Sequence, residues 1–130
     1  MTPTLRHIAP VLLLALGLGG CATLGGRPPL DRDRPETGTA SYYASRFHGR
    51  TTASGVRYDS GEMMAAHRTL PFGTRVRVTH VRNHRSVVVT VVDRGPFRRG
   101  RIIDLSRRAA RELGFVHEGL ATVRVEVVKK

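Results

Sequence analysis

The sequence predicts a small, mainly β domain with one helix, either a barrel or a sandwich, in residues 38–130. Two segments carry this prediction, at 74–80 and 122–128, because their alternating apolar and polar residues are typical of strands with one buried face. An unbroken valine-rich run at 86–92 predicts a strand buried on both faces. The 130-residue chain has room for one domain, and closing the sheet into a barrel would remove its exposed edges.

A shorter strand is expected at 39–44 and a helix at 106–114. Ser106 is the expected N-cap, because its hydroxyl can accept a hydrogen bond from the first turn of the helix. Gly114 is the expected C-terminal stop, because glycine tolerates the left-handed backbone found there. The apolar stripe of this helix would consist of Ala109, Ala110 and Leu113.

The first 20 residues have the pattern of a secretory signal peptide. A basic start at Arg6 and His7 is followed by an apolar run at 8–18 and then by small residues. The sequence "LGGC" that ends at Cys21 resembles a bacterial lipobox, which implies that Cys21 is lipidated and becomes the mature N-terminus. The alternative is an ordinary signal peptide with an incidental cysteine. By the sorting rule for lipoproteins, Ala22 implies anchoring in the outer membrane, facing the periplasm.

Residues 21–37 hold this cysteine and a Pro- and Gly-rich segment without periodicity, which we interpret as a flexible tether. The domain at 38–130 carries 18 of the 22 basic and 7 of the 10 acidic residues, a net charge of +11. Such a charge favours an anionic or neutral polymeric partner. An exported lipoprotein rarely meets nucleic acid, so we expect cell-wall polymer, lipopolysaccharide or phospholipid headgroups and no nucleic acid. A merely solvated surface is the alternative.

Four polar clusters interrupt the apolar pattern and hold the candidate functional residues. They are "FHGRTTASG" at 47–55, "MAAHRTLPFGT" at 64–74, "DRGPF" at 93–97 and "RIIDLS" at 101–106. From the residues alone, Asp93 is most economically a turn-capping residue, and Asp104 is more a helix-start or loop-fixing residue than a catalyst. The histidines lack the close, repeated spacing of a metal site, so we expect no metal and no other cofactor.

Several segments resemble, in order and at unbroken spacing, the rare lipoprotein A family of bacterial wall-associated proteins. They are "GTASYYA", "FHGRTTASG", "AAHRTLPFGTRVRVT", "RSVVVTVVDRGPF", "RIIDLSRRAARELG" and "VRVEVV", between residues 38 and 128. The resemblance implies a six-stranded double-psi β-barrel with one or two short helices, a fold shared with expansins. It also implies an endolytic lytic transglycosylase, a polysaccharide lyase that cleaves peptidoglycan between N-acetylmuramic acid and N-acetylglucosamine and leaves 1,6-anhydromuramyl ends.

By the family pattern, Asp93 is the general acid and base, and His67 is its partner in the cleft. One acid suffices, because the C6 hydroxyl of the muramic acid residue attacks its own anomeric carbon. The acid protonates the leaving oxygen, and the same group or a neighbour then deprotonates the hydroxyl. The valine strand and Phe97 would keep water from Asp93 and favour its protonated form, whereas Arg94 would favour the charged form if the two side chains met.

The expected substrate contacts are Tyr42, His48, Arg50, Arg94 and Phe97. Tyr42 stands where many members have tryptophan, and it keeps an aromatic surface on which a sugar can stack. The arginines can hold sugar hydroxyls or N-acetyl carbonyls through their fixed donor fork. The alternatives are a plain surface position for His48, structural ion pairs for the arginines, and for His67 a buried, hydrogen-bonded histidine.

One position departs from the family pattern. Members commonly carry a glutamate, a proposed third active-site carboxylate, directly after the glycine of "TASG", whereas this chain has Val56. Longer members also add a C-terminal peptidoglycan-binding repeat domain that this sequence lacks. Both departures favour an alternative function, a non-catalytic, expansin-like lipoprotein that binds glycan without cutting it. In either case we expect a monomer that binds peptidoglycan glycan strands.

Overall fold

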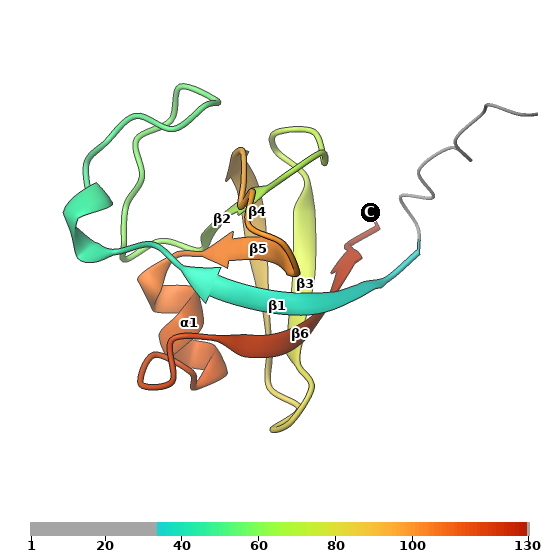
Figure 1. The fold of residues 1–130 in the computed structure, drawn as a ribbon. Helices are drawn as coiled ribbons and strands as arrows, with labels where there is room; N and C mark the ends of the chain where they lie inside the picture. Colours follow the sequence, from blue (N-terminus) through green and yellow to red (C-terminus); the bar gives the residue numbers. More distant parts are fainter. Residues whose placement is uncertain (1–33, 130) are drawn as a thin grey trace, which may run out of the picture. The chain divides into compact units, whose positions relative to one another are not determined.

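In the computed structural model, the described residues are 34–129, and they form a closed β-barrel with one α-helix (Figure 1). The elements are β1 (Glu36–Tyr42), η2 (a 3-10 helix, Ser45–Phe47), β2 (Met64–His67), β3 (Arg75–His80), β4 (Ser86–Asp93), β5 (Arg101–Leu105), α1 (Arg107–Leu113) and β6 (Ala121–Val127). The predicted six-stranded barrel with one or two short helices is confirmed. The predicted signal peptide, the lipidation site Cys21 and the tether up to residue 33 lie outside the described residues.

The strands follow the order β1-β5-β2-β4-β3-β6 around the closed barrel. Two neighbouring pairs, β1 with β5 and β2 with β4, are parallel, and the other pairs are antiparallel. Each parallel pair shifts register part-way along, between Thr39 and Ala40 in β1 and between Ala65 and Ala66 in β2. Parallel neighbours need long connections, and the loop between η2 and β2 (Figure 1) belongs to one of them. The topology fits the double-psi β-barrel that the resemblance implied.

Valine side chains fill much of the interior, as the alternating segments predict. Both β3 and β6 bury every second residue and place arginine or another polar residue between the buried positions. The buried side chains of these two strands are Val76, Val78, Ala121, Val123 and Val125. Each fully buried valine stabilises the fold by about 1.5–3 kcal/mol relative to an exposed one.

The valine run of β4 departs from the expected strand with two buried faces. Val87, Val89 and Val91 are buried, whereas Val88 and Thr90 between them are half-buried. The helix α1 packs against β4, but its seven residues span only about 10 Å. The eight residues of β4 extend about 26 Å, so the helix covers only part of the outer face.

Helix α1 begins and ends where the sequence predicts. The Ser106 hydroxyl accepts a hydrogen bond from the Ala109 N–H at 3.4 Å, and Gly114 closes the helix in the left-handed conformation with φ 85°. The predicted apolar stripe is fully buried against the barrel. Within residues 34–129, no helix is both long and apolar enough to cross a membrane.

Gly38 of β1 lies where the side chain of Ile102 in β5 packs directly on its backbone. A Cβ atom at Gly38 would lie 2.7 Å from Ile102 Cγ2, closer than two non-bonded carbon atoms can approach. Gly38→Ala should therefore lower the free energy of unfolding by about 1–3 kcal/mol, the usual cost of overpacking, as measured by chemical denaturation. The same substitution should cost much less in an Ile102→Ala background, which removes the clashing carbons. An equal cost in both backgrounds would contradict this explanation.

Candidate active site

Four neighbouring strands bring two aspartates to the same face of the barrel wall. The register pairs Ser41 of β1 with Asp104 of β5, Asp104 with Ala66 of β2, and Ala66 with Asp93 of β4. Side chains of residues that lie opposite each other on adjacent strands project from the same face of a sheet. Since neighbouring strands lie about 4.8 Å apart, the backbones of the two aspartates are about 10 Å apart. In the register of the sheet, Ala66 lies between them.

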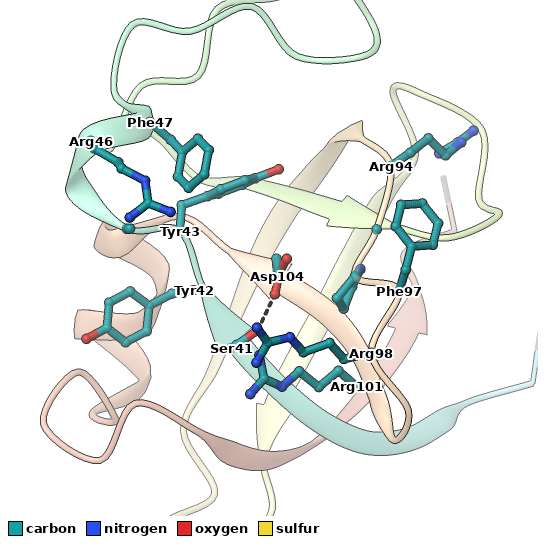
Figure 2. A pocket seen from close by; sticks show the side chains of 13 residues that line it. Ser41, Tyr42, Tyr43, Arg46, Phe47, Arg94, Phe97, Arg98, Arg101 and Asp104 are labelled. Carbon is teal, nitrogen blue, oxygen red and sulfur yellow. Dashed lines mark hydrogen bonds between the residues drawn. The ribbon is translucent and has the colours of Figure 1, made fainter.

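Asp104 belongs to β5 and does not cap the helix. The Ser41 hydroxyl donates a hydrogen bond to Asp104 Oδ1 (Figure 2). Burial raises the pKa of Asp104; the Ser41 hydrogen bond and the charge of Arg101 oppose this shift, while the negative charge of Asp93 reinforces it. A carboxyl group with a raised pKa can keep its proton nearer to neutral pH and can then act as a general acid.

Asp93 ends β4, and both of its carboxylate oxygens accept hydrogen bonds. The Tyr43 hydroxyl donates to Oδ2 at 2.5 Å, and the Ala53 backbone N–H donates to Oδ1 at 2.9 Å. The Tyr43 ring packs against Tyr58, with the ring centroids 4.4 Å apart. Burial raises the pKa of Tyr43, and the hydrogen bond to Asp93 raises it further, so this phenol keeps its proton and remains a donor.

A hollow of about 470 Å³ opens beside Asp104 (Figure 2). The end of β1 and η2 form one wall, and the segment 94–98 forms the other. Its lining includes the aromatic residues Tyr43, Phe47 and Phe97 and the arginines Arg46, Arg94, Arg98 and Arg101. Phe97, a predicted substrate contact, is 79% exposed at the rim. Aromatic faces can stack on sugar rings and guanidinium groups can bind anionic or polar substituents, so the lining suits a charged glycan.

His67 follows Ala66 in β2, but its side chain faces the side of the sheet opposite to the two aspartates. It pairs with the fully buried Ile103, and successive residues of a strand point to opposite faces. Its Nε2 lies 3.3 Å from Glu36 Oε2, and its Nδ1 accepts hydrogen bonds from the N–H groups of Thr69 and Leu70, both at 3.2 Å. Burial lowers the pKa of His67, partly offset by Glu36. The ring is therefore neutral near pH 7, with its proton on Nε2.

Arg94 borders the hollow, but its guanidinium group binds elsewhere. Its Nη1 donates hydrogen bonds to the carbonyl oxygens of His67 and Leu70, at 3.2 and 2.8 Å. The group also lies over the Phe72 ring, 4.1 Å from the centroid, and Figure 2 shows it directed away from Asp104. His67 accepts from the N–H groups of this loop and Arg94 donates to its carbonyl oxygens, so both side chains hold the same loop.

The three remaining predicted contacts do not point into the hollow. Tyr42 borders it, but its hydroxyl donates to the Val116 carbonyl at 2.7 Å, and Figure 2 shows the ring turned away from the hollow. His48 hydrogen-bonds within its own loop and is largely exposed. Arg50 lies over the Phe47 ring, 5.2 Å from its centroid, and does not line the hollow.

Comparison with known proteins identifies the domain. A family profile described as "Lytic transglycolase" matches residues 35–125. The chain belongs to the lytic transglycolase family. A relative named endolytic peptidoglycan transglycosylase RlpA, from Neisseria meningitidis, is 54% identical over 93 residues, which cover 72% of this chain and 39% of the relative. The protein of the same name from Pseudomonas aeruginosa is 54% identical over 89 residues, 68% of this chain and 26% of the relative. These matches confirm the resemblance to the rare lipoprotein A family.

The chain therefore spans about a quarter to two fifths of the length of these relatives. Among solved structures, the Streptomyces papain inhibitor has a TM-score of 0.60 and 26% identity, over 74% of this chain and 96% of the inhibitor. An apo expansin from Clavibacter michiganensis has a TM-score of 0.59 and 25% identity, over 75% of this chain and 52% of the expansin. Similar barrels thus occur in proteins whose names do not denote a transglycosylase.

This member of the lytic transglycolase family holds site residues that the motifs did not single out. They are Ser41, Tyr43, Phe47, Arg98 and Arg101, and Asp104 joins them as a second carboxylate. Strand alternation in "SYYA" was a usable signal, since it places residues 41 and 43 on one face and residue 42 on the other. Val56 is 46% exposed, on the loop whose Ala53 N–H binds Asp93. Within residues 34–129, no three His, Cys, Asp or Glu side chains gather closely enough to hold a metal ion.

We expect His67 to stabilise the fold mainly through its Nδ1 atom, which accepts two backbone hydrogen bonds. His67→Ala would leave two backbone N–H groups without their acceptor and should lower the free energy of unfolding by about 1–3 kcal/mol. His67→Asn should cost less, because an asparagine oxygen can accept from the following backbone N–H groups. Chemical denaturation of both variants measures the difference.

The pH dependence of stability provides a second measurement on the same variants. Because the folded-state pKa of His67 is lowered, the unfolded chain binds the proton more readily. The wild type should therefore lose stability as the pH falls through about 6.5, and His67→Asn, which does not titrate there, should lose less. Parallel curves for the two proteins would contradict this assignment.

Proposed function

We propose that the protein is an endolytic lytic transglycosylase that cleaves peptidoglycan glycan strands between N-acetylmuramic acid and N-acetylglucosamine. The observation that carries the proposal is the presence of Asp93 and Asp104 on one face of the barrel, where Asp104 lines a hollow together with aromatic and cationic side chains. Relatives that share this domain at 54% identity and are named endolytic peptidoglycan transglycosylases support it.

The reaction needs two proton transfers and no external nucleophile. A proton moves to the glycosidic oxygen as its bond to the anomeric carbon breaks, and the C6 hydroxyl oxygen of the muramic acid residue bonds to that carbon. The C6 hydroxyl loses its proton to a base, which yields the 1,6-anhydro end. We assign the first transfer to Asp104, since it borders the hollow and burial raises its pKa.

Asp93 takes the second proton through Tyr43. Tyr43 lines the hollow, and its hydroxyl donates a hydrogen bond to Asp93. As the substrate hydroxyl passes its proton to the Tyr43 oxygen, Tyr43 passes its own proton to Asp93. The phenol stays neutral throughout, in keeping with the raised pKa of Tyr43, which disfavours a phenolate. The two aspartates thus divide the acid and base roles that the family pattern assigned to Asp93 alone.

The predicted cellular location belongs to the same proposal. The signal pattern of residues 1–20 and the "LGGC" motif support export and lipidation of Cys21, and Ala22 supports anchoring in the outer membrane. The following segment up to residue 37 would then allow the domain to reach periplasmic glycan strands. We retain the monomer as the expected state of the chain.

The second candidate function is glycan binding without cleavage. Val56 supports it, because an exposed apolar side chain stands on the loop that hydrogen-bonds Asp93, at a position where the family pattern has a glutamate. The expansin from Clavibacter michiganensis, which shares the barrel at 25% identity, is a neighbour whose name does not denote a transglycosylase.

One experiment separates the two functions. The purified protein is incubated with isolated glycan strands over a range of pH, and the products are analysed by mass spectrometry for 1,6-anhydromuramyl ends. Formation of these ends supports the transglycosylase. Their absence at every pH, together with retained co-sedimentation on peptidoglycan, would overturn it in favour of the binding protein.

Asp104→Asn should abolish the anhydro product, with kcat at least about 100-fold lower, because an amide cannot donate the required proton. The fold should persist, since the asparagine oxygen still accepts from Ser41. Because the pKa of Asp104 is raised in the folded state, the wild type loses stability as the pH rises through that pKa. The variant should therefore melt at a higher temperature than the wild type at neutral pH, with the gap closing in acid. An active Asp104→Asn variant would place the proton donor elsewhere.

Tyr43→Phe tests the proton relay. Removing this hydroxyl should lower kcat by about 10- to 100-fold and leave KM little changed, because the aromatic wall of the hollow remains. Tyr42→Phe is the matched control: it also removes a hydrogen-bonded hydroxyl from a neighbouring position, but one that faces the Val116 carbonyl outside the hollow. Equal kcat losses in the two variants would exclude a specific relay by Tyr43.

A further inference from the structure

The arginines that line the hollow differ in whether other groups of the protein contact their guanidinium groups. The guanidinium group of Arg94 binds two backbone carbonyls, and that of Arg46 lies over the Phe47 ring, 4.9 Å from its centroid. Arg98 and Arg101 differ from these two. Within residues 34–129, neither side chain forms an ion pair, a hydrogen bond or a ring contact. Two strong cationic donor groups are thus left for a ligand in the same hollow.

The backbone that presents these two side chains is held in place. The Arg68 side chain donates from Nε to the Pro96 carbonyl at 2.7 Å and from Nη2 to the Arg98 carbonyl at 2.9 Å. The same Nη2 also donates to the carbonyl of Arg101. One guanidinium group therefore fixes the segment 96–101 at three points. A ligand that binds there does not have to order the loop, which lowers the cost of binding.

The two guanidinium groups also affect the protonation of Asp104, the proposed general acid. Figure 2 shows both side chains extending toward Ser41 and Asp104. Their positive charges oppose the raised pKa of Asp104, the effect of Arg101 being the larger. They thus work against the protonated state that a general acid needs. An anion bound between them would neutralise this effect and return the proton to Asp104.

We propose that Arg98 and Arg101 form a carboxylate subsite that holds an anionic group of the glycan strand beside Asp104. This inference rests on the proposed function, since it identifies the substrate group that the same hollow recognises. Peptidoglycan offers such a carboxylate from two sources. One is the lactyl group of muramic acid where no peptide is attached, and the other is a carboxylate of an attached stem peptide. Either group matches the paired donors of a guanidinium.

The test uses small ligands that contain no glycosidic bond to be cut. They are N-acetylmuramic acid, its lactyl carboxamide, and N-acetylmuramyl-L-alanyl-D-isoglutamine, whose carboxylate lies on the peptide. Binding of each ligand to the full chain is followed by NMR titration. The double variant Arg98→Gln/Arg101→Gln keeps polar side chains but removes both charges. Arg99→Gln is the matched control, because Arg99 belongs to the same segment but does not line the hollow.

The double variant should bind a carboxylate ligand roughly tenfold more weakly than the wild type, equivalent to about 1.4 kcal/mol. It should bind the carboxamide unchanged, and Arg99→Gln should bind every ligand like the wild type. Loss confined to N-acetylmuramic acid identifies the lactyl carboxylate, and loss confined to the dipeptide ligand identifies the peptide carboxylate. Unchanged binding of both acids by the double variant, or an equal loss in Arg99→Gln, would overturn the subsite.

A second measurement connects the subsite to the acid. Titration of the Asp104 carboxyl group by carbon NMR should show its pKa rising when the carboxylate ligand binds, and no rise on adding the carboxamide. An unchanged Asp104 titration at saturating ligand would overturn the placement of the anion beside this residue. Since no ligand is cleaved, these results are independent of the glycan-strand assay. Failure of the subsite and failure of the transglycosylase can therefore be told apart.

Discussion

The pairing of β5 with β2 is the constraint on which the site depends. It sets Asp104 opposite Ala66, and the register of β2 with β4 then sets Asp93 on the same face. A slip of one residue would turn Asp104 into the interior and bring the fully buried Ile103 to the surface. Burying an unpaired carboxylate among valines is costly, and so is exposing isoleucine. The hydrophobic pattern that fills the barrel therefore also enforces the geometry of the carboxylate pair.

The segment 96–101 and the loop after β2 are held by side chains that bind backbone carbonyls and amides. Arg68 holds the segment 96–101, Arg94 holds the loop after β2, and His67 accepts two N–H groups of that same loop. These segments lie outside the strands, so nothing in the sheet ladders would satisfy their polar groups. The barrel supplies the stability that offsets the cost of holding the half-buried Asp104 in place. Such sites commonly trade stability for reactivity.

The barrel could be predicted from the sequence only in part. Alternation and the Ser106 and Gly114 caps located β3, β6 and α1, whereas β2 and β5 were interpreted as polar clusters. These strands have four and five residues, mix apolar with charged side chains, and owe their extended form to neighbours far away in the sequence. The family resemblance supplied the six-stranded barrel. In the site, motif matching pointed to Tyr42, whose hydroxyl binds the Val116 carbonyl. Its neighbour Tyr43 projects to the same face as the carboxylates and binds Asp93.

The arginines show why composition alone cannot identify a partner. A net charge of +12 suggests a broadly anionic ligand, but the guanidinium groups around the hollow are not equivalent. The side chains of Arg68 and Arg94 donate hydrogen bonds to carbonyl oxygens 24 to 33 residues away in the sequence. No local sequence pattern reveals these contacts. Arg98 and Arg101, whose side chains have no hydrogen-bond partner within residues 34–129, are the ones left to bind a ligand. They lie beside Asp104, whose protonation they oppose. Charge neutralisation by the substrate would then restore the acid only when the correct ligand is bound. Recognition and protonation of the acid are thereby coupled through two side chains.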